Sequence, residues 1–136
     1  MRYKVLLVGL GNIGLRYDIK HTKDYILTHS RAFSYHDDFE IVAGVDVDES
    51  NCALFESTYK VKTYNNLQMA LNNTEVSIFV VSTPTYSHNE VITQILDREN
   101  PKVILCEKPI SYDFSEASDI VAKCKEKKCM LYVNYM

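Results

Sequence analysis

The sequence predicts a doubly wound α/β fold, with a mostly parallel sheet of six strands in the order 3-2-1-4-5-6 and helices on both faces. Two observations lead to this prediction. Short apolar runs alternate with helical patterns along the chain, which is typical of repeated strand–helix–strand units. The first apolar run leads directly into a glycine-rich turn, and the second run ends at an acidic residue.

The predicted strands are runs of apolar and β-branched residues. They cover residues 5–8, 41–45, 76–81, 103–106 and 130–133, with a weaker run at 61–64. The uninterrupted apolar run at 5–8 is typical of a strand that is buried on both faces. With 136 residues the chain has the length of one domain, so residues 1–136 are predicted to fold around a single sheet.

Two of the intervening helices have clear sequence signals. A helix over residues 113–127 is predicted from a pair that resembles a capping box, Asp113 and Glu116, and from an apolar stripe expected to face the core. The members of that stripe are Phe114, Ala117, Ile120, Val121 and Cys124. The apolar side of a second helix, over residues 86–97, consists of Val91, Ile92, Ile95 and Leu96.

The composition argues against several classes of function. A formal net charge of -3 gives no electrostatic reason to expect a nucleic acid or an anionic membrane as a partner. No apolar run approaches the ~20 residues of a membrane span, and the start is too short for a signal peptide, so a cytoplasmic protein is expected. The cysteines have neither CxxC spacing nor nearby histidines, and no metal site is predicted.

Residues 9–14 carry the first functional signal, a GxGxxG motif directly after a strand. The first glycine allows a tight turn, the second lets the main chain approach a diphosphate, and the third lets the next helix pack against the sheet. Unpaired N–H groups at the start of that helix would face the anion. The predicted dinucleotide contacts here are Gly9, Gly11, Asn12, Ile13 and Gly14. Such turns also serve simple strand-to-helix packing, which remains the alternative.

Asp46 follows the strand at 41–45, where a dinucleotide-binding sheet places an acidic residue to bind the adenosine ribose. A 2′-phosphate at ~4 Å from this carboxylate would meet a repulsion of about 4 kcal/mol at an effective dielectric constant near 20. No Arg or Lys directly follows Asp46 to offset that repulsion, so the predicted cofactor is NAD in preference to NADP. The alternative is that Asp46 only opens a turn and caps the next helix.

Residues 17–28 lengthen the first crossover. Asp46 stands about a dozen residues further from Gly14 than the roughly 20-residue spacing that is usual for this motif. The extra segment is polar and is expected to be a mobile loop at the mouth of the cleft. A surface insertion without a role of its own is the favoured interpretation, because long loops cost little, and a lid or substrate-contacting loop is the alternative.

Two further turns follow the predicted strands at 76–81 and 103–106. Ligands of such sheets sit at the carboxyl ends of the strands, so both turns are expected to border one cleft. The first turn contains Thr83, Pro84 and His88, and the second contains Glu107, Lys108 and Pro109. Together with the glycine turn and Asp46, these motifs resemble the Gfo/Idh/MocA family of oxidoreductases over nearly the whole chain, and the second is similar to the EKP motif of that family.

The resemblance implies the N-terminal Rossmann domain of an NAD(P)-dependent dehydrogenase that acts on a sugar, a cyclitol or a related small molecule. Lys108 would be the catalytic residue, beside the nicotinamide and the substrate, where an ammonium group can hydrogen-bond an alkoxide as charge develops. A lysine with its charge in water is the alternative. The other implied cofactor contacts are Ser82, Thr83, Pro84, His88, Glu107 and Lys108. The remaining histidines, His21, His29 and His36, match no motif and are expected at the surface.

The chain departs from the family in several respects, among them the longer first crossover and Thr85, where many relatives have an asparagine after the proline. Tyr17 stands where many relatives have a histidine, and relatives continue into a second domain that supplies most of the substrate contacts. Residues 1–136 are therefore expected to bind NAD with little or no turnover, and apolar surface left for that domain would favour homo-oligomers. The alternatives are a nucleotide-sensing or regulatory module without catalysis and an interaction domain that has lost its ligand.

Overall fold

The computed structural model describes residues 1–22 and 24–135, so Lys23 of the segment 17–28 lies outside the described residues. It contains one parallel sheet of six strands in the order β3-β2-β1-β4-β5-β6, which confirms the predicted fold class. The strands are β1 (Tyr3–Val8), β2 (Phe39–Val45), β3 (Thr63–Tyr64), β4 (Ile78–Val81), β5 (Val103–Glu107) and β6 (Met130–Asn134). Each predicted run forms a strand, and the weakest run gives the shortest one.

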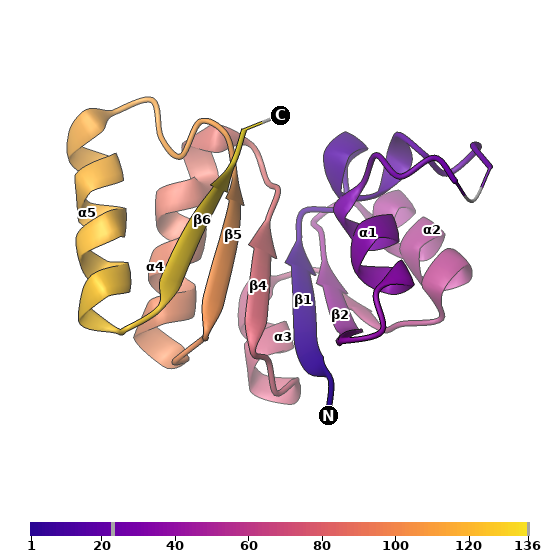
Figure 1. Ribbon diagram of the computed structural model, residues 1–136, viewed down its shortest axis with the longest axis horizontal. Coiled ribbons are helices and arrows are strands. Elements are labelled where there is room, and N and C mark those ends of the chain that lie inside the picture. Colours follow the sequence, from indigo (N-terminus) through magenta and orange to yellow (C-terminus); the bar gives the residue numbers. More distant parts are fainter. Residues whose placement is uncertain (23, 136) are drawn as a thin grey trace.

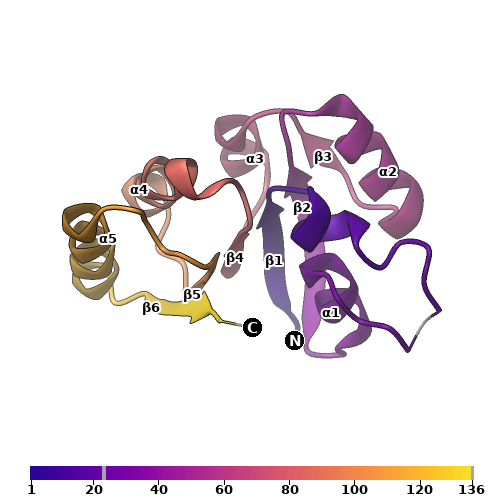
Figure 2. The ribbon, with the colours of Figure 1, turned by 90° about the horizontal axis from the view of Figure 1, so that it is seen from above.

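Helices connect the strands and cover both faces of the sheet (Figure 1). Short helical turns follow two strands, η1 (Asn12–Arg16) after β1 and η2 (Thr85–Ser87) after β4. The α-helices are α1 (His29–Tyr35), α2 (Glu49–Tyr59), α3 (Leu67–Asn73), α4 (His88–Arg98) and α5 (Phe114–Glu126). Figure 2 looks down on the carboxyl ends of the strands, with α1 on one side of the sheet and α3 and α4 on the other. Across the described residues, none of the helices has the length and apolar character of a membrane span.

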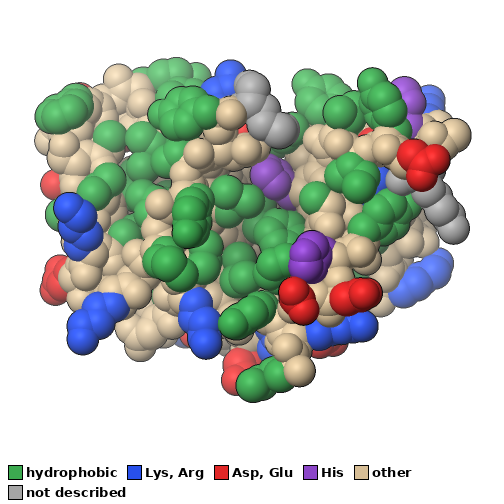
Figure 3. Space-filling view, viewed as in Figure 1, with side chains coloured by type: hydrophobic (Ala, Val, Ile, Leu, Met, Phe, Trp, Pro, Cys, Tyr) green, Lys and Arg blue, Asp and Glu red, His purple; other side chains and the backbone are tan. Residues whose placement is uncertain are grey.

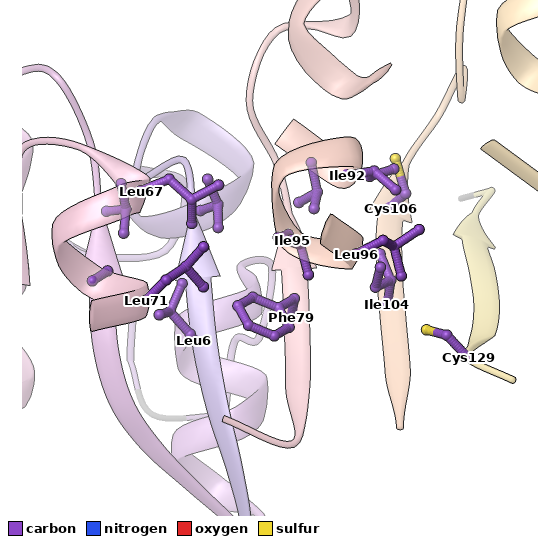
Figure 4. Packing of buried hydrophobic residues seen from close by; sticks show 14 of the residues in the cluster. Leu6, Leu67, Leu71, Phe79, Ile92, Ile95, Leu96, Ile104, Cys106 and Cys129 are labelled. Atoms are coloured by element: carbon purple, nitrogen blue, oxygen red, sulfur yellow. The ribbon is translucent and has the colours of Figure 1, made fainter. Parts of the chain in front are cut away.

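Two hydrophobic clusters hold the helices to the sheet, one on each face. Successive side chains of a strand point to opposite faces, so β1 contributes Leu6 to one cluster and Leu7 to the other. On the Leu6 side, residues such as Phe79 and Ile104 of the strands pack against Leu71, Ile95 and Leu96 of the helices (Figure 4). β1 is therefore buried on both faces, as its sequence predicts.

The apolar stripe of α5 is narrower than predicted. Ile120 and Cys124 are buried, whereas Phe114 is 87% exposed and Val121 is 40% exposed. The helix lies at the edge of the sheet and packs mainly on α4 and β6, so it has a partner on one side only. Its N-terminus forms half of the predicted capping box, because Asp113 accepts a hydrogen bond from the amide of Glu116 at 2.9 Å.

Hydrophobic side chains also gather over β5 and β6 on the face seen in Figure 3. Val103 pairs in register with Met130, and Leu105 pairs with Tyr132, so the four side chains share one face of the sheet. Met130 and Tyr132 are 55% and 56% exposed. On this face, the end of the sheet at β6 is therefore less covered than its centre, where Val5 and Leu7 of β1 are fully buried.

The segment 17–28 is tied to the fold by a buried aspartate that no sequence pattern marked. Asp18 is fully buried, and its carboxylate accepts hydrogen bonds at 2.8 Å from the amides of Leu27 and Thr28. Arg31 of α1 lies 3.5 Å from the same carboxylate and also donates to carbonyl oxygens of the segment. These contacts fix both ends of the segment to α1, which its description as a polar surface loop did not anticipate.

Candidate functional site

A cleft of about 790 Å³ opens at the carboxyl ends of β1, β2 and β4. This volume is usual for small-molecule sites, and the position is the one where ligands bind to doubly wound sheets. The predicted site residues that line the cleft are Gly9, Gly11, Asn12, Ile13, Asp46, Ser82, Thr83 and Pro84. The others, Gly14, His88, Glu107 and Lys108, are not part of its lining.

One wall of the cleft was missed by the sequence motifs. It consists of the turn before α3, the turn η2 and the first half of α4. Its residues are Asn65, Asn66, Leu67, Tyr86, Ser87, Glu90, Val91 and Gln94. Those in the turns follow β3 or β4 closely in sequence, whereas those in α4 carry no signal of a site, and Val91 was predicted to face the core. Tyr17, which closes η1, also lines the cleft.

The glycine turn combines two close backbone contacts with one open position. Gly9 has a φ of +96°, and a Cβ atom there would lie 2.6 Å from the carbonyl carbon of Ser82. A Cβ atom on Gly14 would lie against the carbonyl oxygen of Gly9. At Gly11, a Cβ atom would have no neighbour within 4 Å among the described residues. Gly9 and Gly14 therefore keep the turn close to the sheet, while Gly11 leaves space toward the cleft.

Three consecutive amides of the same turn are available to a ligand. The N–H groups of Leu15 and Arg16 both donate to the carbonyl oxygen of Gly11, at 2.9 and 3.0 Å. Those of Gly11, Asn12 and Ile13 have no hydrogen-bond acceptor within residues 1–22 and 24–135. Since all three residues line the cleft, an anion bound there would satisfy these donors.

The carboxylate of Asp46 lies in the cleft and also fixes the glycine turn. Its Oδ2 accepts hydrogen bonds from the amide of Leu10 at 2.8 Å and from the side-chain amide of Asn51 at 3.1 Å. Its Oδ1 accepts one from the amide of Asp48 at 2.8 Å. A carboxylate has about four acceptor sites, so it can still accept a bond from a ligand. Asp48 and not Asp46 caps α2, so the capping part of the alternative is wrong, whereas Asp46 does open a turn by its bond to the amide of Asp48.

The guanidinium group of Arg16 is connected to Asp46 through the side chain of Asn51. Arg16 donates from Nε to Oδ1 of Asn51 at 2.6 Å and from Nη2 to the hydroxyl of Ser50 at 3.2 Å. The pKa of the nearby Asp48 carboxyl lies below its usual value, mainly because Ser50 donates to it and to a smaller extent because of the Arg16 charge. Arg16 is the last residue of η1, thirty residues before Asp46 in sequence, so the residues that directly follow Asp46 gave no sign of this cation.

The turn after β4 closes directly on the glycine turn. The hydroxyl of Ser82 donates to the carbonyl oxygen of Gly9 at 2.8 Å. The hydroxyl of Ser87 donates to that of Thr83 at 2.7 Å, which shapes the turn into α4. The glycine turn and the turn after β4 are far apart in sequence, but they are in contact in the structure and both line the cleft.

His88 lies behind the cleft rather than in it. The residue is 1% exposed, and its Nε2 lies 2.9 Å from the carbonyl oxygen of Thr83. Its Nδ1 lies 3.1 and 3.2 Å from the carbonyl oxygens of Pro109 and Ile110. The imidazole therefore connects the turn after β4 to the turn that contains Lys108.

His29 reaches the same region from α1. Its Nε2 lies 2.6 Å from Oε1 of Glu107, which also accepts a hydrogen bond at 2.8 Å from the side chain of Asn134. Because the residue is only 9% exposed, the expectation of a surface position for His29 is wrong. Its partner is remote in sequence, so no local pattern could mark it. Lys108 is exposed and forms no salt bridge among the described residues.

The cysteines act as packing residues. All four are free, and Cys106, Cys124 and Cys129 are buried. Burial raises the pKa of the Cys106 thiol to about 12 and that of Cys124 to about 11, so both thiols stay protonated at neutral pH. In the part of the chain that the structure describes, no three histidine, cysteine or acidic side chains are grouped as metal ligands.

Sequence comparison connects this geometry to known proteins. The family model GFO_IDH_MocA, described as "Oxidoreductase family, NAD-binding Rossmann fold", matches residues 3–135. Inositol 2-dehydrogenase 1 of Paenarthrobacter aurescens is 34% identical over 83 residues, which are 60% of this chain and 24% of that protein. Glucose-6-phosphate 3-dehydrogenase of Bacillus subtilis is 30% identical over 90 residues, which are 66% of this chain and 25% of that protein.

Solved structures share the fold at lower identity. The WlbA dehydrogenase from Bordetella pertussis, in complex with NADH and UDP-GlcNAcA, matches 98% of this chain and 37% of its own, with a TM-score of 0.82 and 21% identity. Biliverdin reductase from Synechocystis, in complex with biliverdin and NADP+, matches 97% of this chain and 37% of its own, with a TM-score of 0.80 and 19% identity. The chain thus spans about a quarter of these curated relatives and about a third of these solved chains.

Proposed function

The chain belongs to the Gfo/Idh/MocA oxidoreductase family with its NAD-binding Rossmann fold, and from this membership we propose that the cleft binds NAD across the carboxyl ends of β1, β2 and β4. The observation that carries the proposal is the row of amides at Gly11, Asn12 and Ile13, which have no acceptor in the described part of the chain and lie in a cleft that also contains the Asp46 carboxylate. Donors for a diphosphate and an acceptor for ribose hydroxyls are the groups that an adenine dinucleotide requires.

The glycine turn would hold the diphosphate. A side chain at Gly11 would fill the space next to the amides, and glycine leaves that space open. Ser82 keeps the turn in place by its bond to the Gly9 carbonyl oxygen, so the donors are arranged before a ligand arrives. Such preorganisation reduces the entropic cost of binding.

Asp46 would accept hydrogen bonds from the adenosine ribose and would favour NAD over NADP. A 2′-phosphate would add negative charge beside the carboxylate of Asp46, which already lies next to another acidic residue, Asp48. Arg16 weakens this discrimination without reversing it, because its guanidinium is engaged by Asn51 and Ser50. The expected result is a preference for NAD with measurable binding of NADP.

The activity we propose for the protein that uses this domain is hydride transfer to or from a hydroxyl or carbonyl carbon of a sugar, a cyclitol or a related compound. The nicotinamide ring, when bound, supplies the hydride or accepts it. Lys108 would hold the proton at the substrate oxygen, since its ammonium group is exposed and has no salt-bridge partner among the described residues. His88 would act on the backbone of this region, not on the ligand.

A nucleotide-sensing module is the second candidate. It is favoured by one observation, that His88, Glu107 and Lys108 do not line the cleft that contains the glycine turn. The two functions differ in their dependence on Lys108. A Lys108→Met substitution would abolish hydride transfer by a dehydrogenase, whereas a sensor would bind its nucleotide and respond to it as before.

Calorimetric titration of the chain with NAD+ and NADH tests the proposed binding. We expect a dissociation constant in the micromolar range and a loss of at least tenfold, about 1.4 kcal/mol, in Asp46→Ala. Asp38→Ala removes an exposed carboxylate elsewhere and serves as the matched control, with unchanged affinity. Affinity no better than millimolar, and insensitive to Asp46→Ala, would rule the proposal out.

A further inference from the structure

The turn that carries Lys108 is held by two imidazole rings that come from different helices. His88, the first residue of α4, lies within 3.1 and 3.2 Å of the carbonyl oxygens of Pro109 and Ile110, after the lysine. His29, the first residue of α1, lies 2.6 Å from the side chain of Glu107, before the lysine. The backbone after Lys108 and the side chain of the residue before it are therefore held, while Lys108 itself is exposed.

The contact of His29 with Glu107 is largely shielded from solvent. The side chains are 10% and 14% exposed, so water competes little for either group. Asn134, which pairs with Glu107 in register at the ends of β6 and β5, donates to the same carboxylate oxygen at 2.8 Å. Two donors from two elements thus converge on one acceptor, which fixes the rotamer of Glu107.

These hydrogen bonds affect whether the carboxylate of Glu107 forms a salt bridge with the adjacent Lys108. An acidic side chain next to a lysine in sequence can compete for the ammonium group. Here Oε1 of Glu107 is occupied by His29 and Asn134, and no Lys108–Glu107 salt bridge forms among the described residues. The ammonium group of Lys108 therefore remains available to a ligand.

We propose that His29 is a positioning residue for Lys108, which acts through Glu107 to hold the lysine at the nicotinamide end of the cleft. This inference rests on the proposed function, because it assumes that a nicotinamide nucleotide binds. It also gives the crossover segment a role. The hydroxyl of Thr28 donates to buried Asp18 at 2.9 Å and accepts from the amide of Arg31 at 3.2 Å, so the segment 17–28 sets where α1, and hence His29, begins.

NMR spectroscopy of the chain with 13C-dimethylated lysines tests this inference. The signal of Lys108 is identified by its absence in Lys108→Arg. NADH and ADP-ribose are the two probes, since they share the adenosine and the diphosphate and differ in the nicotinamide. We expect NADH, but not ADP-ribose, to shift the Lys108 signal of the native chain.

The variants separate positioning from binding. In His29→Ala, the NADH-induced shift at Lys108 should fall to less than half, while the affinity for ADP-ribose stays within twofold of the native value. His29→Gln should restore the shift, because its side-chain amide can donate to Glu107. His36→Ala removes an exposed histidine and should behave as the native chain.

Three outcomes would overturn the inference. One is an equal NADH-induced shift in His29→Ala and in the native chain, and another is native binding of NADH without any shift at Lys108. If His29→Ala does not fold, Glu107→Ala removes the group through which His29 would act, and an unchanged shift in that variant counts against the inference too. Failure of the native chain to bind both NADH and ADP-ribose is a different result, because it removes the proposed function itself.

Discussion

At the scale of single residues, Gly11 and Gly14 have different roles in the glycine motif. Gly14 is buried, and a Cβ atom there would meet the backbone of Gly9. Gly11 faces open space, so the folded chain has no packing reason for a glycine at that position. The motif therefore contains two positions, Gly9 and Gly14, where the fold requires glycine, and one, Gly11, where the proposed ligand would require it.

This division predicts opposite effects of two equal substitutions. Gly11→Ala should leave stability within about 0.5 kcal/mol of the native value, because no neighbour is displaced, and should weaken NADH binding at least tenfold. Gly14→Ala should lower the midpoint of thermal unfolding by several degrees, because backbone must move. Calorimetry and thermal melts of both variants provide the check, and equal losses of stability would contradict the assigned roles.

Arg16 supplies a second test at this scale. Its guanidinium is the cation bonded to Asn51, the residue that donates to Asp46, so it lies near the place proposed for the adenosine ribose. Arg16→Met should lower the affinity for NADP+ at least threefold more than the affinity for NAD+, and Arg16→Lys should retain most of the native ratio. Equal losses for the two cofactors in Arg16→Met would show that the charge plays no part in discrimination.

At the scale of elements, the first crossover depends on the buried carboxylate of Asp18. Its charge is balanced by two amides, a hydroxyl and Arg31. Removing one partner of a buried charge pair costs about 3–5 kcal/mol, so Asp18→Ala should reduce the free energy of unfolding by that amount. Asp24→Ala, an exposed carboxylate in the same segment, should change it by less than about 0.5 kcal/mol in urea denaturation. Similar values for the two variants would contradict this account of the crossover.

The strands and helices also show which features of the fold can be predicted from the sequence. Every strand was found from apolar runs, and the signal is clearest where a strand is buried on both faces, as in β4 and most of β1. The partners of Asp18, the contact of His29 with Glu107 and the exposure of Phe114 were not found, since each depends on which segment packs against it. The periodicity of α5 could locate the helix, but only the sheet edge decides how wide its buried stripe is.

At the scale of the whole molecule, the candidate site is assembled from the ends of strands that are remote in sequence. The sequence located the glycine turn, Asp46 and the turn after β4, because each directly follows a strand. It did not locate the wall formed by α4 or the approach of Arg16 to Asn51. Those features arise only when the sheet is assembled, so no local pattern carries them.

The buried thiol of Cys106 links the stability of the whole fold to pH. Its folded pKa is raised from 9.0 to about 12, so between these values the unfolded chain loses a proton that the folded chain keeps. Stability from this group is complete below pH 9 and decreases above it, by about 1.4 kcal/mol between pH 8 and pH 10. Urea denaturation at both pH values should show that Cys106→Ala loses this part of the pH dependence.

A matched control separates the thiol from the cavity that alanine leaves. Ile104→Ala truncates another fully buried residue of β5 and contains the same thiol as the native chain. It should be destabilised at both pH values and retain the native difference between them. A native pH dependence in Cys106→Ala would refute the assignment.

The most direct test of the account is an NMR titration of the 15N-labelled chain with NADH. Binding of the diphosphate to the glycine turn predicts that the amides of Gly11, Asn12 and Ile13, which have no acceptor among the described residues, show the largest downfield shifts. Asp46→Ala should reproduce the pattern only at much higher NADH concentration. If these three amides keep their positions while NADH binds, or if NADH does not bind at millimolar concentration, the dinucleotide does not lie where this account places it.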